Sequence, residues 1–254
     1  MLDLVTIPCL SDNYAFLLHD EKTGKTALID APEPLPIEDE LEKRGWTLSE
    51  IWLTHHHWDH IDGVADLVAS TGARVFGAEA DKHRLPPLDQ SLTPGTSFDF
   101  AGHTVEVLDV PGHTIGHIAF YVPAAKAAFT GDSLMAMGCG RLFEGRPEQM
   151  WDSLQRLSKL PPDTLICSGH EYTGGNISFA LTIEPQNDAL RDRRDRVEAA
   201  RADGLPTVPS LLSDEQETNP FLRAHLSSVK AALHMETADD AEVFTEIRAQ
   251  KDDF

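Results

Sequence analysis

The chain has 254 residues, of which 41% are hydrophobic and 25% charged, the composition of a globular protein. With 21 Lys and Arg residues against 42 Asp and Glu, the formal net charge is −21, which repels phosphate backbones and anionic lipid. No run approaches 18 consecutive apolar residues. We therefore expect neither nucleic acid nor a membrane as a partner. Three dispersed cysteines and a start that lacks signal-peptide features favour a cytoplasmic protein.

Residues 1–172 alternate between short apolar runs and a few helical patterns. Strands are predicted where β-branched and aromatic residues gather between turn residues, at 2–7, 14–18, 26–29, 51–54, 74–76, 104–108, 118–122, 127–130 and 165–167. Helices are predicted where apolar residues recur at helical spacing, at 37–44, 62–70 and 147–160. This mixture predicts an α/β domain.

The strand pattern ends near residue 174. Residues 187–203 form a polar helical pattern with five arginines among five acidic residues, which favours a solvated helix face over a nucleic-acid site. A loop at 204–209 and a helix at 238–250 follow. We therefore predict a small, all-helical second domain.

Ligand-type side chains are concentrated in the segment Thr-His-His-His-Trp-Asp-His at 54–60, directly after an apolar strand. His55 and His57 are two residues apart, so in extended chain they project to the same side, and His56 points away. Asp59 and His60 follow where the chain turns toward a helix. Imidazole and carboxylate together suit zinc or another first-row metal.

Three more candidates stand alone, each beside a glycine at a strand end: His113, Asp132 and His170. Together with the first four they make seven potential ligands, more than one tetrahedral zinc needs and suitable for two. Asp132 is the only carboxylate outside the first cluster, so we expect it to bridge the two ions.

This pattern resembles the metallo-β-lactamase superfamily. The similarity is closer to glyoxalase II, the hydroxyacylglutathione hydrolase family, and it extends to the terminal Lys-Asp-Asp-Phe. It is carried by five segments, namely 11–14, 130–132, 138–145, 169–173 and 219–223. The resemblance implies an αβ/βα sandwich of two mixed sheets, with a catalytic domain at 1–172 and a helical substrate-binding domain at 173–254.

The resemblance also implies a function, the cleavage of S-D-lactoylglutathione to D-lactate and glutathione during methylglyoxal detoxification. Two divalent ions, zinc with iron or manganese as alternatives, would share a bridging hydroxide, since such a pair lowers the pKa of water to about 7. Asp59 and Asp132 would be the catalytic residues. The ligands would divide into two sets joined by Asp132, one of His55, His57 and His113 and the other of Asp59, His60 and His170.

The substrate contacts of the family fall on Arg141, Phe143, Tyr172, Arg248 and Lys251. The cations suit the two carboxylates of glutathione, although without the resemblance Arg248 and Lys251 would be a surface pair on one helix face. Position 143 is often tyrosine in the family, so a hydroxyl contact is missing here. We expect a monomer acting on a small glutathione thioester.

Two alternatives remain. A glutathione persulfide dioxygenase of the same fold would use a single iron, but that group lacks the long C-terminal domain. A non-catalytic metal-binding protein would be expected to fill four positions per ion. Seven ligands shared by two ions imply open, catalytic positions instead.

Overall fold

The computed structural model describes residues 1–254. The chain divides into two compact units, the first made of residues 1–109 and 116–131, the second of residues 110–115 and 132–254. None of the helices combines the length and the apolar character needed to cross a membrane.

The first unit begins with a six-stranded sheet in the order β1-β2-β3-β4-β5-β6. The first three strands pair antiparallel and the last three join in parallel, so the sheet is mixed. The strands are β1 (Leu2–Cys9), β2 (Asn13–Asp20), β3 (Lys25–Ile29), β4 (Thr47–Trp52), β5 (Arg74–Ala78) and β6 (Gln90–Leu92). Because parallel pairs need crossovers, helices follow β3 and β4.

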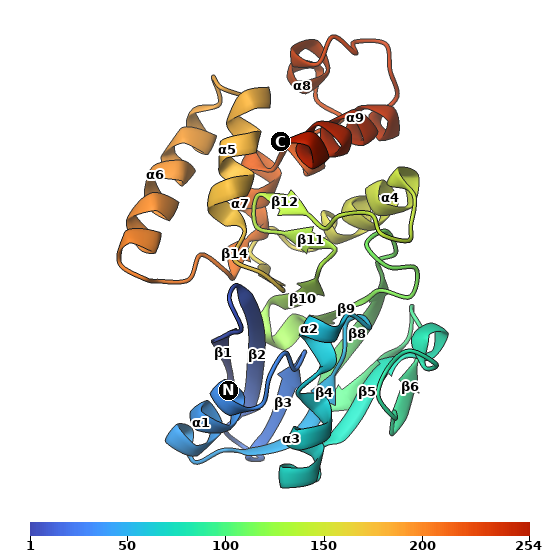
Figure 1. Cartoon of the computed structure of the whole chain (residues 1–254), viewed down its shortest axis with the longest axis vertical. Helices are drawn as coiled ribbons and strands as arrows, with labels where there is room; N and C mark the ends of the chain where they lie inside the picture. Colours follow the sequence, from blue (N-terminus) through green and yellow to red (C-terminus); the bar gives the residue numbers. More distant parts are fainter. The chain divides into compact units, whose positions relative to one another are not determined.

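Helices α1 (Leu35–Arg44) and α3 (Val64–Thr71) share one apolar core with this sheet. Ile37 and Leu67, one from each helix, are both fully buried in that core with Leu28 and Ile51 of β3 and β4. Figure 1 shows both helices beside the sheet, with the short helix α2 (Trp58–Ile61) between β4 and α3 in the chain. The 3₁₀ turn η1 (Glu79–Asp81) follows β5.

A second group of four antiparallel strands completes the first unit, in the order β10-β9-β8-β7. They are β7 (Ser97–Phe100), β8 (His103–Asp109), β9 (Ile118–Val122) and β10 (Ala127–Gly131), with the turn η2 (Pro123–Ala125) between the last two. Aromatic rings pack between the two groups of strands. The Trp52 ring centre lies 5.2 Å from Phe100 and 5.6 Å from Phe120. Covered on both faces, β2 is buried at all eight positions.

The second unit is mainly helical. Its strands form two short antiparallel pairs, β11 (Leu134–Met135) with β12 (Gly138–Cys139) and β13 (Leu165–Ser168) with β14 (Ser210–Leu211). Its helices are α4 (Pro147–Leu157), α5 (Thr173–Ile183), α6 (Asp188–Ala202), α7 (Leu212–Thr218), the 3₁₀ turn η3 (Pro220–Leu222), α8 (Ser227–Ala232) and α9 (Asp240–Asp253).

A buried polar network organises the β11–β12 hairpin within this unit. Glu215 is fully buried, pairs with Arg193, and accepts a hydrogen bond from the backbone N–H of Met137 at 2.8 Å. Asn219 donates to the carbonyl of Gly138 at 3.0 Å and to Glu215 at 3.0 Å. A buried charge is stable only when it is paired in this way. The network therefore fixes the hairpin that leads from position 132 to position 141.

The predicted α/β class on two sheets is confirmed, and every predicted strand and helix is present within a few residues. Three details of these predictions differ, and strands β6, β7, β11 and β12, each of two to four residues, were not predicted. The helix expected at 147–160 ends at Leu157, the one at 62–70 divides into α2 and α3, and the helical C-terminal region contains the two-residue strand β14. Helix α5 was not predicted, because Gly174 and Gly175 open it and apolar residues surround its axis.

Candidate metal centre

Four predicted ligands lie on the loop that follows β4 and on the short helix α2. His55 and His60 are fully buried, and their ring centres are 4.2 Å apart. The ring of His57 lies 4.7 Å from that of His55. His57 adopts an extended conformation as the N-cap of α2, which places Asp59 and His60 in its first turn. The loop thus brings three imidazoles and one carboxylate together.

Asp30, which directly follows β3, anchors this loop by hydrogen bonds. Its Oδ1 accepts the backbone N–H of Thr54 at 2.8 Å, and its Oδ2 lies 2.8 Å from the Thr54 hydroxyl and 2.9 Å from Nδ1 of His60. Asp30 is 3% exposed and has a left-handed backbone, with φ of 56°. A carboxylate on Nδ1 leaves Nε2 of His60 as the atom that can bind a metal.

The other two histidines of the region take different partners. Nδ1 of His56 lies 3.3 Å from the buried carboxylate of Asp81, while His117 stacks on His55 with ring centres 4.7 Å apart. Asp81 also pairs with Arg84 at 2.6 Å. His56 therefore contacts η1, in keeping with the prediction that it points away from the ligands.

The remaining predicted ligands lie in the second unit, where one carboxylate oxygen faces two imidazoles. Oδ2 of Asp132 is 3.4 Å from Nε2 of His113 and 3.3 Å from Nε2 of His170. Two ligands at 2.0–2.2 Å from one tetrahedral ion are separated by about 3.3–3.6 Å. The donor set and its spacing therefore fit divalent metal, with Asp132 shared between the two histidines.

The backbone around residue 140 fixes His113. Nδ1 of His113 lies 2.7 Å from the carbonyl oxygen of Arg141, again leaving Nε2 for a metal. A Cβ at Gly140 would stand 2.0 Å from the carbonyl oxygen of Asp132 and 2.9 Å from Nδ1 of His113. Only glycine permits this close approach.

Two predicted substrate-binding aromatics lie beside these ligands. Phe143 is 64% exposed and meets His113 edge-on, with ring centres 5.2 Å apart. Tyr172 is 43% exposed and stacks on His170 at 4.7 Å. Both therefore present an accessible aromatic surface next to a ligand.

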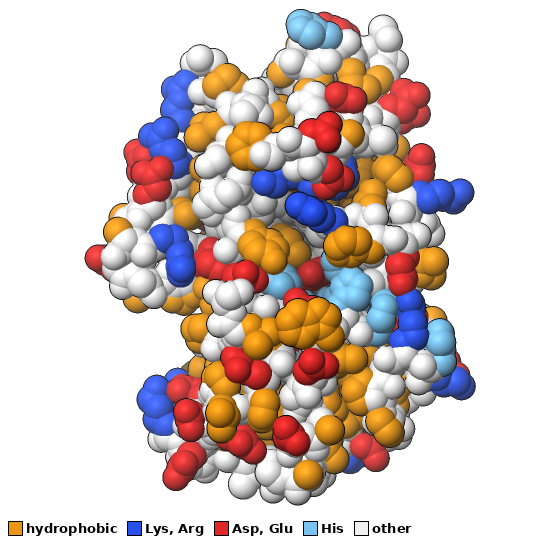
Figure 2. Space-filling view, viewed as in Figure 1, with side chains coloured by type: hydrophobic (Ala, Val, Ile, Leu, Met, Phe, Trp, Pro, Cys, Tyr) orange, Lys and Arg blue, Asp and Glu red, His pale blue; other side chains and the backbone are white.

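The predicted cations Arg141, Arg248 and Lys251 also belong to the second unit, but their environments differ. Arg141 is exposed, whereas Arg248 is only 4% exposed; it donates to the Cys139 carbonyl oxygen at 3.0 Å and pairs with Asp252 at 2.9 Å. Partial burial, with the charges of Arg248 and Arg141, lowers the pKa of Lys251. Figure 2 shows basic side chains gathered beside α5 and α9.

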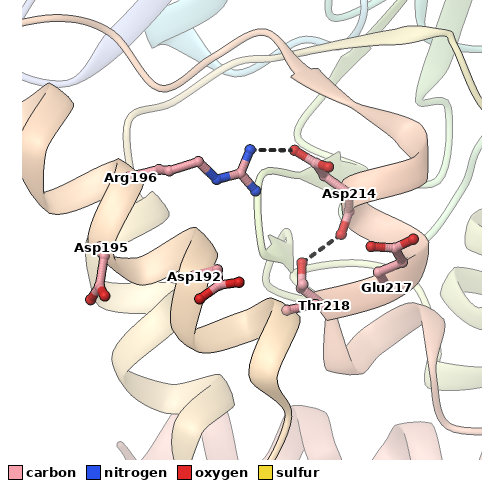
Figure 3. A pocket seen from close by; sticks show the side chains of 7 residues that line it. Asp192, Asp195, Arg196, Asp214, Glu217 and Thr218 are labelled. Carbon is pink, nitrogen blue, oxygen red and sulfur yellow. Dashed lines mark hydrogen bonds and ion pairs between the residues drawn. The ribbon is translucent and has the colours of Figure 1, made fainter.

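A pocket of about 530 Å³ between α6 and α7 is a different kind of cavity (Figure 3). It is lined by four carboxylates, and its one basic side chain, Arg196, pairs with Asp214 at 3.5 Å. None of the predicted site residues lines it. An anionic substrate would be repelled there.

Sequence reasoning missed two residues that support the predicted ligands, Asp30 and Asn13. Both come from strand ends that pack on the loop, and Asn13 donates hydrogen bonds to Asp59. The segment 11–14 had been noted only as a similarity. An acidic residue ending a strand, as Asp30 does, was the available signal.

Comparison with known proteins first defines the class. The metallo-beta-lactamase superfamily model matches residues 11–170. Among solved structures, the BLEG-1 B3 metallo-beta-lactamase has a TM-score of 0.68 at 20% identity, over 87% of this chain and 99% of that one. The TTHA1623 structure, solved in a di-iron-bound form, has a TM-score of 0.56 at 29% identity, over 66% of this chain and 91% of that one. The protein is a metallo-beta-lactamase-fold enzyme, and its fold and His/Asp groups indicate a dinuclear centre of divalent metal.

Full-length relatives narrow this class. The model for the hydroxyacylglutathione hydrolase C-terminus matches residues 171–254. The hydroxyacylglutathione hydrolase of Ruegeria pomeroyi is 61% identical over 100% of this chain and 99% of its own length, and that of Jannaschia sp. is 62% identical over 99% and 98%. The chain belongs to the hydroxyacylglutathione hydrolase family.

Proposed function

We propose that this protein hydrolyses S-2-hydroxyacylglutathione thioesters, with S-D-lactoylglutathione as the principal substrate, to a hydroxy acid and glutathione. In this proposal the seven predicted ligands form one dinuclear centre. His55, His57 and His113 would hold one ion and Asp59, His60 and His170 the other, and Asp132 would be a ligand of both. Family membership over the full chain supports this grouping. Zinc fits the donor set, and iron or manganese is compatible with it.

When bound, two divalent ions lower the pKa of water toward 7 and polarise a carbonyl group. The chain supplies the orientation and the proton acceptor. Asp30 and the Arg141 carbonyl fix His60 and His113 through their Nδ1 atoms. Asp59 is partly exposed, so its carboxylate can accept the proton of the attacking water. A thiolate is a good leaving group, with a thiol pKa near 8.5, so the reaction needs no strong general acid.

Substrate binding is assigned to the second unit. Phe143 and Tyr172 offer aromatic surface beside the ligands His113 and His170. Burial lowers the pKa of Lys251, and Arg248 and Arg141 lie close enough for their positive charges to lower it further, while Asp252 pairs with Arg248. Glutathione carries two carboxylates, and such a cluster attracts them. We also propose that residues 1–172, which contain all seven predicted ligands, act as the catalytic domain. Residues 173–254 would act as the substrate-binding domain through Arg248 and Lys251, joined by contacts from Arg141, Phe143 and Tyr172.

The observation that carries the proposal is the shared oxygen of Asp132, 3.4 Å and 3.3 Å from the two histidine nitrogens. The test compares S-D-lactoylglutathione with a D-lactoyl thioester of a short, uncharged thiol on the same metal-loaded protein. Loss of two charge-assisted contacts, each contributing about 1.5–3 kcal/mol, should lower kcat/KM at least about 100-fold for the short thioester. Equal values would show that the glutathione moiety is not recognised.

We further propose a cytoplasmic monomer that takes part in methylglyoxal detoxification. All three cysteines are free and buried, which suits a reducing compartment. Burial raises the pKa of Cys9 to about 12 and that of Cys139 to about 11, so neither thiol is reactive at neutral pH. Size-exclusion chromatography with light scattering tests the monomer, for which a mass of 28.0 kDa is expected.

A further inference from the structure

The side-chain amide nitrogen of Asn13 donates two hydrogen bonds, both to Asp59. Nδ2 donates to the Asp59 backbone carbonyl oxygen at 2.9 Å and to the carboxylate oxygen Oδ2 at 3.1 Å. An amide nitrogen has two hydrogens, so both are committed to Asp59. The Asn13 side chain is 4% exposed, and it begins β2 opposite Cys9. A rigid sheet strand therefore holds the donor.

The position of Asp59 in the fold gives its carboxylate little support from the helix that carries it. Its side chain is 20% exposed, and the adjoining Trp58 is 63% exposed, whereas His60 is fully buried. It lies in a helix of only four residues, which has little stability of its own. A pair of hydrogen bonds that joins the backbone and the carboxylate of one residue restricts both rotations of that side chain.

We propose that Asn13 is a positioning residue that fixes the carboxylate of Asp59 in the orientation in which it binds metal and accepts a proton. This inference rests on the proposed function. A neutral donor suits the task, because it takes one lone pair of Oδ2 and leaves the negative charge in place. Aspartate at position 13 would have the same shape, but it would offer no donor and would repel Asp59.

The test uses Asn13→Asp and Asn13→Ala, with Asp12→Asn as the matched control in the same turn. Asp12 is partly exposed, and its carboxylate accepts a hydrogen bond from the neighbouring Ser11 hydroxyl at 3.0 Å. Zinc affinity is measured without substrate, by competition with a chromophoric chelator. Loss of a group that orients a metal ligand weakens metal binding by about 10- to 100-fold. We expect such a loss for one of the two zinc equivalents, larger for Asn13→Asp, and less than a twofold change for Asp12→Asn.

Thermal unfolding of the metal-free proteins separates this role from a merely structural one. Positioning predicts weaker zinc binding and lower kcat in a folded variant, with KM changed little. Unchanged affinity for both zinc equivalents in a folded Asn13→Ala protein would overturn the inference, as would affinity loss that only follows unfolding. If Asn13→Asp does not fold, the zinc affinity of Asn13→Ala alone tests the inference, since this substitution removes both hydrogen bonds without adding charge. Failure of the parent to hydrolyse S-D-lactoylglutathione would refute the function and leave the zinc result intact.

Discussion

The two groups of predicted ligands are held in place by different means. In the first unit, side chains from distant strands orient the ligand loop, with Asp30 on His60 and Asn13 on Asp59. In the second unit, the backbone does so, through the Arg141 carbonyl on His113 and the close approach at Gly140. Side-chain support can be removed by an isosteric substitution, whereas backbone support depends on the hairpin that the helices hold. Substitutions of the supporting residues should therefore affect metal binding and stability differently in the two groups.

The largest effect is expected at Asp132, which faces ligands of both proposed ions. Asp132→Ala should lower the binding of both metal equivalents, whereas His57→Ala should weaken mainly one. Hydrolysis should fall in both by more than the roughly 10- to 100-fold typical for a residue that only supports a ligand. Metal analysis after dialysis, with steady-state kinetics on the same samples, measures this. Retention of both metals in Asp132→Ala would refute the bridge.

Asp30→Asn breaks the side-chain support of the first unit. The amide keeps the shape of the side chain, but its nitrogen cannot accept all the hydrogen bonds that the carboxylate accepts from Thr54 and His60. An unsatisfied buried donor costs about 1–3 kcal/mol, so the free energy of unfolding should fall by that amount. Metal affinity should fall about 10- to 100-fold. The exposed Asp62, at the end of α2, provides the control Asp62→Asn, for which no change is expected.

Arg248 and Lys251 should have different roles. We expect Arg248 to stabilise the fold and Lys251 to contact the substrate. Arg248 is buried and is bonded to the Cys139 carbonyl, so Arg248→Ala should lower the unfolding temperature and kcat. Lys251 is less buried, so Lys251→Ala should raise KM for the glutathione thioester by about tenfold or more with little change in kcat. Denaturation curves and kinetics of both variants decide. An equal rise in KM and an equal fall in stability in the two variants would show that both residues bind the substrate as one clamp.

The pH dependence of KM sharpens the assignment of Lys251. Its pKa lies below the usual value because of burial and neighbouring positive charge. The anionic substrate binds the protonated amine, so KM should rise as the pH increases through this lowered pKa. Lys251→Arg should remove the rise, since arginine stays charged. A KM profile identical in the parent and in Lys251→Arg would exclude a direct contact.

The smallest effect is expected at His56, which lies between two ligands in the chain but contacts Asp81. His56→Ala should keep two metal equivalents and most of its activity. A loss as large as that of His57→Ala would mean that the loop faces the other way.

The grouping of the four candidates at 55–60 could be predicted from sequence, because they lie within six residues and alternation puts His55 and His57 on the same side. The supports could not. Asp30 and His60 are 30 residues apart, and Asn13 and Asp59 are 46 apart, so only the sheet order brings each pair together. The burial of Arg248 could not be predicted from sequence either, since it depends on contacts with Cys139 and with the Phe221 ring 5.0 Å away. Strands such as β2 and β9 were predictable because burial on both faces makes them continuous apolar runs.

The most direct test of the account is a metal titration of the metal-free protein, followed by hydrolysis of S-D-lactoylglutathione at each step. The account predicts that activity is absent without metal, that full activity requires two zinc equivalents per chain, and that a strong chelator abolishes it. Hydrolysis by fully metal-free protein would contradict the account. So would a folded protein that holds two equivalents and does not cleave the thioester.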